Sequence, residues 1–330
     1  MSRPIRLLLA GTTAALAVAA LLVYLAYRSD LAAARARIAS GSGIAQTRCG
    51  PIEYAEAGQG PAVLLIHGAG GGFDQTAEAG REIAARGYRV ISPSRFGYLR
   101  TPQPADATPA AQADAHACLL DALGIARAAI VAVSAGSPSA MQFALRHPQR
   151  CGALVLLAPL AYSPRAAERL RRPAADSLLE RAVDSDFVYW LLTRLPPSVG
   201  VQGVLGIPSQ RYEAAEAAER GRIDRLLRQP LPISERREGM LNDLTVATRL
   251  PRYELERIVS PTLLVSAPDD LYGTFESARY MAAHIRGARL LALPDGGHLW
   301  VGHHRQVLDA VSDFLRLAGG APPATPRAGE

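Results

Sequence analysis

The chain of 330 residues contains no lysine, so all 36 of its basic side chains are arginines. These arginines are spread along the chain and interleaved with acidic residues, whereas nucleic-acid-binding proteins gather basic residues in one run or on one face. Despite the net charge of +6, the sequence therefore argues against a nucleic-acid partner. Apolar residues make up 49% of the chain and charged residues 20%, which is typical of a globular protein.

Cysteine is almost as scarce. The three cysteines, Cys49, Cys118 and Cys151, lie far apart and match no known spacing of metal ligands. We expect them to be small core residues, or to include one disulfide pair. The sequence therefore predicts no metal site.

Charge is absent from residues 7–27, which form a 21-residue, largely apolar stretch. As an α-helix this stretch would span about 30 Å, the thickness of a bilayer's hydrocarbon core. The alternative is a cleaved signal peptide, whose apolar region is usually only about 7–15 residues long and precedes a small-residue cleavage site. Because Tyr24, Tyr27 and Arg28 make a poor cleavage site, we predict an uncleaved membrane anchor over residues 1–28.

The orientation of this anchor is not set by charge, because arginines flank the apolar stretch on both sides. A short basic amino terminus before a single span resembles a bacterial signal anchor. We therefore expect a single-pass membrane protein whose remaining chain lies on the outer, periplasmic side.

Continuous apolar runs follow, and strands that are buried on both faces of a sheet have this composition. The runs are residues 62–68, 88–93, 128–134, 151–159, 261–267 and 288–294. Segments with helical spacing, such as residues 76–86 and 111–123, separate most of them. This alternation predicts a mostly parallel α/β sheet with right-handed crossovers. An antiparallel pair, residues 44–47 and 52–56 with a turn at Gly50 and Pro51, is expected to open the sheet.

One long interruption breaks the alternation and defines the expected domains. Residues 160–251 have helical periodicity and no clear strand, and an insertion there would cover the carboxyl edge of the sheet, where such folds bind ligands. We interpret it as a helical cap on a core of residues 44–159 and 252–317; the alternative is a long surface excursion. Residues 29–43 are expected to be an amphipathic linker, and residues 318–330 a disordered tail rich in Pro, Gly and Ala.

Ser134 stands at a corner between one of these strands and a helix. Pro138 fits the first turn of that helix, where its missing N–H has no helical partner. A nucleophile at a sharp strand-to-helix turn needs small residues two positions before and after it, and here they are Ala132 and Gly136. The sequence "AVSAG" thus departs by one methyl group from Gly-x-Ser-x-Gly; the alternative is a serine at an ordinary strand end.

Together with other motifs, this corner resembles the α/β-hydrolase superfamily over residues 46–317. The motifs that carry the resemblance are "LLIHGAGGG", "SPSRFGYLRTP", "VAVSAGSPSA", "HPQRCGALVLLAP", "PTLLVSAPDD" and "PDGGHLWVGH". The resemblance implies Ser134 as nucleophile and an oxyanion hole made by the backbone N–H groups of Ala69 and Ala135. His67 is interpreted as a turn-forming residue rather than a base.

The base and the acid are expected after the last two strands, because the chain order in this fold is serine, acid, histidine. His298 lies in the glycine-rich loop "DGGH" after the final strand, and it is the predicted base. Asp269 and Asp270 both follow the preceding strand. In the family pattern the acid stands nine positions after the strand's opening proline, which selects Asp270.

This constellation implies acyl transfer to water on a small-molecule substrate, without a metal or an organic cofactor. We expect an ester or lactone of modest size and apolar character, with carbon–carbon bond hydrolysis as the second choice and an amino-terminal peptidase as the third. A non-catalytic ligand-binding protein is the alternative of a different class. Gly70 would let substrate approach the backbone, and Phe73 and Trp300 are candidate pocket residues, although packing is the commoner role of such aromatics.

Overall fold

The computed structural model of the chain describes residues 3–162, 164 and 184–319, and its centre is an eight-stranded sheet. The strand order is β1-β2-β4-β3-β5-β6-β7-β8. The strands are β1 (Gly43–Thr47), β2 (Gly50–Ala57), β3 (Ala62–Ile66), β4 (Arg89–Pro93), β5 (Ala128–Val133), β6 (Cys151–Leu157), β7 (Thr262–Ser266) and β8 (Arg289–Ala292). β2 is antiparallel to both of its neighbours, and all other pairs are parallel. The predicted, mostly parallel sheet is confirmed.

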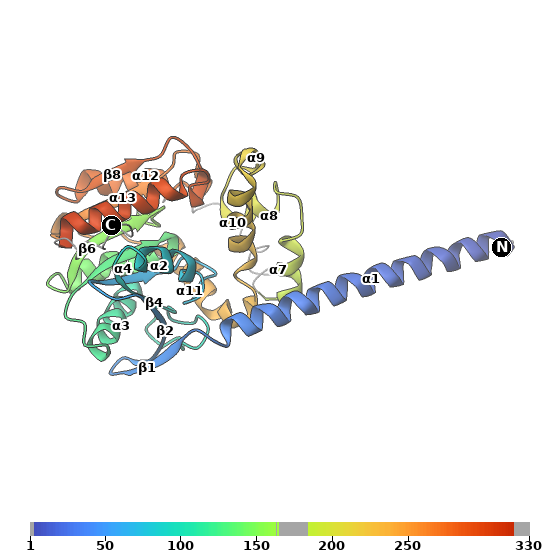
Figure 1. Cartoon of the computed structure of the whole chain (residues 1–330), viewed down its shortest axis with the longest axis horizontal. Coiled ribbons are helices and arrows are strands. Elements are labelled where there is room, and N and C mark those ends of the chain that lie inside the picture. Colours follow the sequence, from blue (N-terminus) through green and yellow to red (C-terminus); the bar gives the residue numbers. More distant parts are fainter. Residues whose placement is uncertain (1–2, 163, 165–183, 320–330) are drawn as a thin grey trace, which may run out of the picture.

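Helices cover both faces of this sheet (Figure 1). They are α2 (Ala77–Ala84), α3 (Pro109–Ala122), α4 (Ser137–Arg146), α12 (Thr274–His284) and α13 (His304–Gly319). Successive strand residues point to opposite faces, so Ile130 and Leu154 pack with α3, α4 and α12, whereas Val131 and Val155 pack with α2 and α13. Each strand therefore needs apolar residues at every position, which explains the continuous apolar runs.

The hairpin that opens the sheet turns two residues earlier than expected. Thr47 pairs with Gly50, so Arg48 and Cys49 form the turn and Gly50 already belongs to β2. Gly50 has a φ of +98°, a conformation that glycine adopts without steric cost. A disulfide joins Cys49 to Cys118 on α3, and Cys151 is a buried free thiol on β6.

Between β6 and β7 the described residues form helices and no strand. They are α7 (Asp186–Leu192), α8 (Gly200–Leu205), α9 (Ser209–Ala214), α10 (Ala217–Arg228), the 3-10 turn η2 (Ile233–Arg236) and α11 (Arg237–Arg249). We call this region, residues 160–251, the cap. Its residues 163 and 165–183 lie outside the described part of the chain, as does the expected tail after Gly319.

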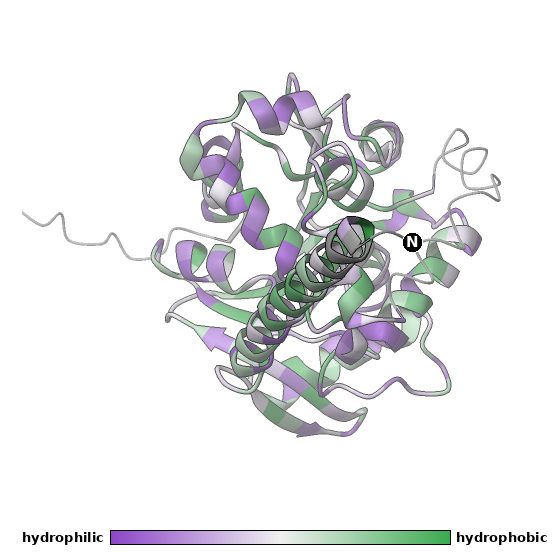
Figure 2. Ribbon diagram, turned by 90° about the vertical axis from the view of Figure 1, so that its right-hand side faces the viewer, coloured by the Kyte–Doolittle hydropathy of each residue, from purple (hydrophilic) through white to green (hydrophobic). Residues whose placement is uncertain are grey.

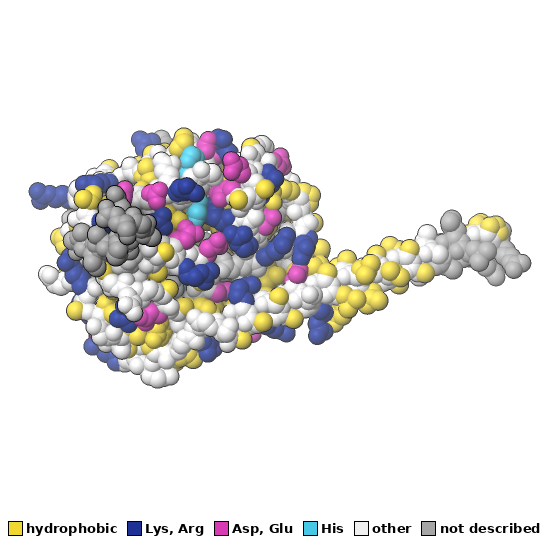
Figure 3. Space-filling view, in the orientation of Figure 1, with side chains coloured by type: hydrophobic (Ala, Val, Ile, Leu, Met, Phe, Trp, Pro, Cys, Tyr) yellow, Lys and Arg dark blue, Asp and Glu magenta, His cyan; other side chains and the backbone are white. Residues whose placement is uncertain are grey.

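The amino-terminal helix α1 (Arg3–Ile38) projects from the domain (Figure 1). Its part Gly11–Ile38 is long and apolar enough to cross a membrane and is almost unburied. Apolar residues follow one another along the projecting part (Figure 2), and charged side chains on the visible face end where α1 leaves the domain (Figure 3). The linker expected from residue 29 is helical as far as Ile38, because Leu31 and Ala34 are buried beside the cap.

Candidate active site

Ser134 directly follows β5 and begins the 3-10 turn Ser134–Gly136, which leads into α4. Its φ of +50° lies in the left-handed region, which a residue with a side chain adopts only when its surroundings impose it. A β-carbon added at Gly136 would lie 2.6 Å from the carbonyl oxygen of His67, and Ala132 is fully buried. The two small residues are therefore required by packing around this corner, as the nucleophile-elbow interpretation expects.

Asp270 and His298 form a buried acid–base pair at the carboxyl ends of β7 and β8. Asp270 Oδ2 lies 2.9 Å from His298 Nδ1, and both side chains are buried. Asp270 also accepts hydrogen bonds from the Thr274 hydroxyl and, over 2.9 Å, from the Tyr272 N–H. Burial alone would raise the pKa of Asp270, but the facing His298 and these hydrogen bonds lower it below its usual value.

The charged form of Asp270 fixes the tautomer of His298. An ionised carboxylate can only accept a hydrogen bond, so Nδ1 must carry the proton and donate it. Nε2 is then free to act as a base. Among the described residues, no hydrogen bond joins Ser134 Oγ to His298. Nucleophile–base bonds are often long in unliganded enzymes and tighten when substrate binds.

Asp269 has a different role from its neighbour. Its Oδ1 accepts a hydrogen bond of 2.9 Å from the Gly297 N–H, and its Oδ2 accepts one of 3.2 Å from the Gly296 N–H. Arg211 on α9 also lies 3.2 Å from Oδ2. Asp269 thus holds the loop that carries His298.

The turn after β3 is held from within by His67 and Gln75. His67 Nε2 accepts the Arg95 N–H at 2.9 Å, so Nδ1 carries the proton that it donates to Gly68 O at 2.7 Å. Burial and the Arg95 guanidinium hold the pKa of His67 well below its usual value, which keeps the ring neutral. Gln75 accepts the Gly68 N–H at 2.9 Å and donates to Ala69 O at 3.2 Å.

These contacts place the two predicted oxyanion donors on fixed backbone. Ala69 lies in the turn that Gln75 holds, and Ala135 lies in the first turn of a helix, where backbone N–H groups have no helical acceptor. His67 positions this turn, which is the role expected from the sequence, and makes no described contact with Ser134.

A buried ion pair connects the same turn to the cap, and the sequence analysis did not find it. The Arg95 guanidinium donates to the carbonyl oxygens of His67 and Gly68, each at 3.1 Å, and forms two bonds of 2.7 and 2.6 Å with Asp243 on α11. Tyr98 donates a further bond of 2.5 Å to Asp243. Arg95 belongs to the motif "SPSRFGYLRTP", but nothing in the sequence pairs it with a residue 148 positions away.

Removing the carboxylate of this pair should cost much stability. Asp243→Ala leaves the buried Arg95 charge unpaired, so we expect the free energy of unfolding to fall by about 3–5 kcal/mol. Urea denaturation measures the change. The control is Glu254→Ala, which breaks an exposed pair with Arg257 and should change stability by less than about 1 kcal/mol. Equal effects of the two substitutions would contradict the interpretation.

The cap rests directly on the two loops that carry Asp270 and His298. Gly206 O, at the end of α8, accepts the N–H groups of Leu271 at 3.1 Å and of His298 at 3.4 Å. The Tyr272 hydroxyl donates to Val204 O at 2.7 Å, and its ring meets the His298 ring edge-on at 4.8 Å. Tyr272 therefore links the cap to His298.

The three predicted substrate-binding residues have different surroundings. Gly70 is buried, and a β-carbon added there would lie 3.1 Å from Pro230 of the cap. Phe73 lines a cavity of about 800 Å³ between α2, β2, β4 and α10, which Ser134, Asp270 and His298 do not line. Trp300 packs in the core beside α13, and its Nε1 lies 3.5 Å from His304 Nδ1. Substrate contact by these residues stays a prediction.

The described residues include no cluster of three or more His, Cys, Asp or Glu side chains that could hold a metal ion.

Residues 61–301 match the model of a family described as the alpha/beta hydrolase fold. The chain is 29% identical over 269 residues to the uncharacterized hydrolase YcgS of Bacillus subtilis, covering 77% of this chain and 90% of the relative. It is 26% identical over 304 residues to the 2-hydroxy-6-oxononadienedioate/2-hydroxy-6-oxononatrienedioate hydrolase of Paraburkholderia xenovorans, covering 84% and 93%. The structure of an alpha/beta hydrolase fold protein from Nakamurella multipartita is similar with a TM-score of 0.66 and 30% identity, covering 84% of this chain and 100% of that one. The matched residues 61–301 include Ser134, Asp270 and His298.

Proposed function

The chain belongs to the α/β-hydrolase family, and on that premise we propose that it is a serine hydrolase that cleaves a carboxylic ester or lactone of modest size and apolar character. The observation that carries this proposal is the 2.9 Å pair of Asp270 and His298 at the sheet edge, where Ser134 holds a φ of +50°. In this proposal the three residues form a Ser-His-Asp triad. The hydrolase names of the relatives agree with it.

In the proposed reaction, Ser134 Oγ attacks the substrate carbonyl carbon while His298 Nε2 takes the hydroxyl proton. Asp270 stabilises the imidazolium that forms. The negative oxygen of the tetrahedral intermediate accepts hydrogen bonds from Ala69 N–H and Ala135 N–H, and one such donor is typically worth about 10²–10³ in kcat. His298 then protonates the leaving alcohol, and water repeats the cycle on the acyl-enzyme.

The second candidate is hydrolysis of a carbon–carbon bond. It is favoured by the relative from Paraburkholderia xenovorans, which is named for such substrates and is similar over 84% of this chain. The same triad would serve, so the two reactions would differ in the substrate that the site accepts.

An ester series compared with a ring-fission product tests these alternatives. We expect p-nitrophenyl acetate and butyrate to be hydrolysed at least about tenfold faster, in kcat/KM, than the palmitate ester, because the cap limits pocket volume and entry. Equal rates for short and long chains would contradict a covered pocket. Cleavage of a 2-hydroxy-6-oxo-dienoate without ester hydrolysis would select the second candidate, and inertness toward both would select a binding protein.

We also propose that α1 is an uncleaved membrane anchor and that the domain lies outside the cytoplasm. Its apolar part Gly11–Ile38 is long enough to cross a bilayer. The disulfide Cys49–Cys118 supports the location, because disulfides persist in oxidising compartments such as the periplasm. The contacts of α1 with the cap also support an intact helix, since Trp190 donates to Asp30 at 2.7 Å.

A further inference from the structure

The cap has an exposed apolar strip beside the point where α1 leaves the domain. It consists of Phe187, Val188 and Leu191 on α7, with Leu195 and Val199 in the turn that follows, and each is between 38% and 44% exposed. We call these five residues the apolar cap face. Phe187 and Leu191 lie one turn apart on the same side of α7. Leu195 and Val199 follow after the helix ends, and Tyr189 and Trp190 are buried.

The position of this strip is fixed relative to the expected bilayer by α1 itself. The ring of Tyr27, the last residue of the apolar stretch 7–27, meets the Phe187 ring edge-on at 5.2 Å and the Trp190 ring at 5.7 Å. Asp30, one turn further along α1, accepts the Trp190 indole N–H at 2.7 Å and pairs with Arg194. The carboxyl-terminal end of the apolar stretch therefore packs against α7.

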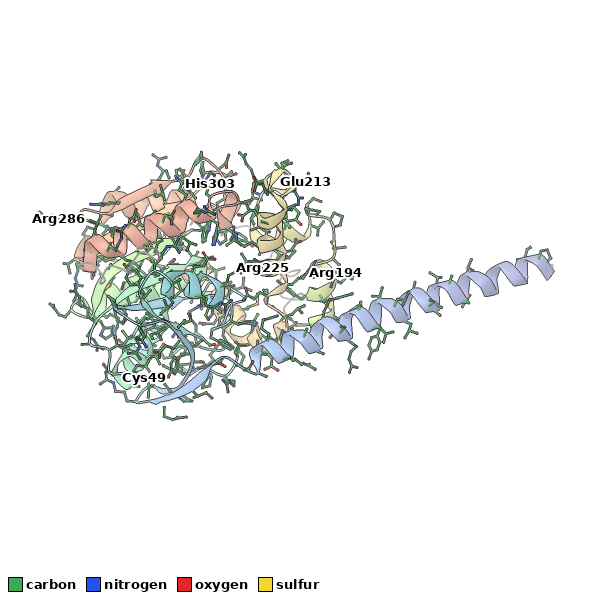
Figure 4. The ribbon with its side chains drawn as sticks, in the orientation of Figure 1. Cys49, Arg194, Glu213, Arg225, Arg286 and His303 are labelled. Carbon is green, nitrogen blue, oxygen red and sulfur yellow. A yellow bond between two sulfur atoms is a disulfide. The ribbon has the colours of Figure 1, made fainter. Side chains whose placement is uncertain are left out.

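Figures 1 and 4, which show the molecule in one orientation, are in agreement with this position. α7 and α8 lie on the side of the domain from which α1 projects (Figure 1), and Arg194 lies beside α1 on that side (Figure 4). A bilayer that contains residues 7–27 of α1 would end at the level of Tyr27, and there it would meet Phe187. Apolar side chains next to polar ones at such a level are typical of helices that lie in the membrane interface.

We propose that the apolar cap face is a second membrane contact, which dips into the bilayer interface and holds the cap against the membrane. The inference rests on the proposed anchor, and it adds that the cap, rather than the sheet, faces the lipid. The same segment continues through α8 to Gly206, whose carbonyl oxygen accepts the N–H groups of Leu271 and His298. A membrane contact at α7 would therefore be separated only by the short helix α8 from the loops that carry Asp270 and His298.

Site-specific fluorescence in the full-length protein tests the contact. Single substitutions Val18→Cys, Leu191→Cys and Val259→Cys are labelled with the polarity-sensitive fluorophore NBD, and the protein is inserted into phosphatidylethanolamine–phosphatidylglycerol nanodiscs that contain nitroxide lipids. The native cysteines should stay unlabelled, because Cys49 and Cys118 are bonded to each other. Burial raises the pKa of the Cys151 thiol to about 11. Val259 is the matched control. It is an apolar residue that is 74% exposed, and it precedes β7, so it lies at the amino-terminal edge of the parallel strands, opposite the edge that carries Ser134, Asp270 and His298.

We expect nitroxides near the headgroups to quench the label at position 191 at least twofold, and nitroxides deep in the acyl chains to quench the label at position 18, with no quenching at position 259. Quenching at 18 but not at 191 would overturn the membrane contact and leave the anchor standing. No quenching at 18 would overturn the anchor, and the contact with it. Oxidative cross-linking of two Leu191→Cys chains without lipid quenching would also overturn the inference, since a second copy would then cover the strip.

Discussion

Replacing Ser134 with alanine is expected to lower kcat on p-nitrophenyl butyrate by about 10⁶-fold, the loss seen when a serine hydrolase loses its nucleophile. Among the described residues, no other serine, threonine or tyrosine has a φ in the left-handed region. Alanine keeps the backbone of the turn, so thermal denaturation should show a folded protein. Steady-state turnover of the purified full-length protein in detergent measures the change.

Ser137 provides the matched control three residues along the same helical turn. Its hydroxyl is fully buried and has no hydrogen-bond partner within the described residues, so Ser137→Ala removes no bond and should change kcat by less than about twofold. A large loss in Ser137→Ala, with Ser134→Ala near wild type, would show that the wrong serine has been identified.

The second large effect is expected at the acid. Asp270→Asn should lower kcat by about 10⁴-fold, because an amide cannot stabilise the imidazolium and favours the wrong tautomer of His298. Asp269→Asn should cost less than about tenfold, since its amide oxygen can still accept the Gly297 N–H that Asp269 Oδ1 accepts at 2.9 Å. Turnover and urea denaturation of both variants separate loss of chemistry from loss of folding.

The double variant completes this test, because two adjacent carboxylates could substitute for one another. If Asp270→Asn retains wild-type turnover and Asp269→Asn is crippled, the acid has been assigned one residue too late. If only the double variant is crippled, neither carboxylate acts alone as the acid.

Most of the sheet could be predicted because its signal is local. Buried parallel strands need apolar residues on both faces, so each of the six runs, such as residues 128–134, marks a strand. The hairpin turn was misplaced because Gly-Pro is a common turn pair, whereas here the positive φ of Gly50 belongs to the first residue of β2. The helical extension to Ile38 could not be predicted, since it depends on contacts of Asp30 and Arg37 with the cap.

The residues of the site also fall into those that local sequence predicts and those whose roles depend on distant contacts. Ser134 and His298 are predicted from short motifs, and Asp270 from its register after β7, because each prediction depends on neighbours in sequence; the structure places Asp270 within 2.9 Å of His298. The roles of Asp269, Asp243 and Tyr272 could not, because they arise where the cap or a distant loop packs on the site. Phe73 illustrates the limit: it follows Ala69 and Gly70 closely in sequence but lines a cavity that Ser134 does not line.

The central claim is that Ser134 is an activated nucleophile, and covalent labelling tests it most directly. The folded full-length protein is treated with a fluorophosphonate, digested with trypsin and analysed by mass spectrometry. We predict one adduct per chain, located on Ser134 in the peptide of residues 128–146, and no adduct in Ser134→Ala. A folded protein that stays unlabelled, or carries the adduct on another residue, would contradict the account.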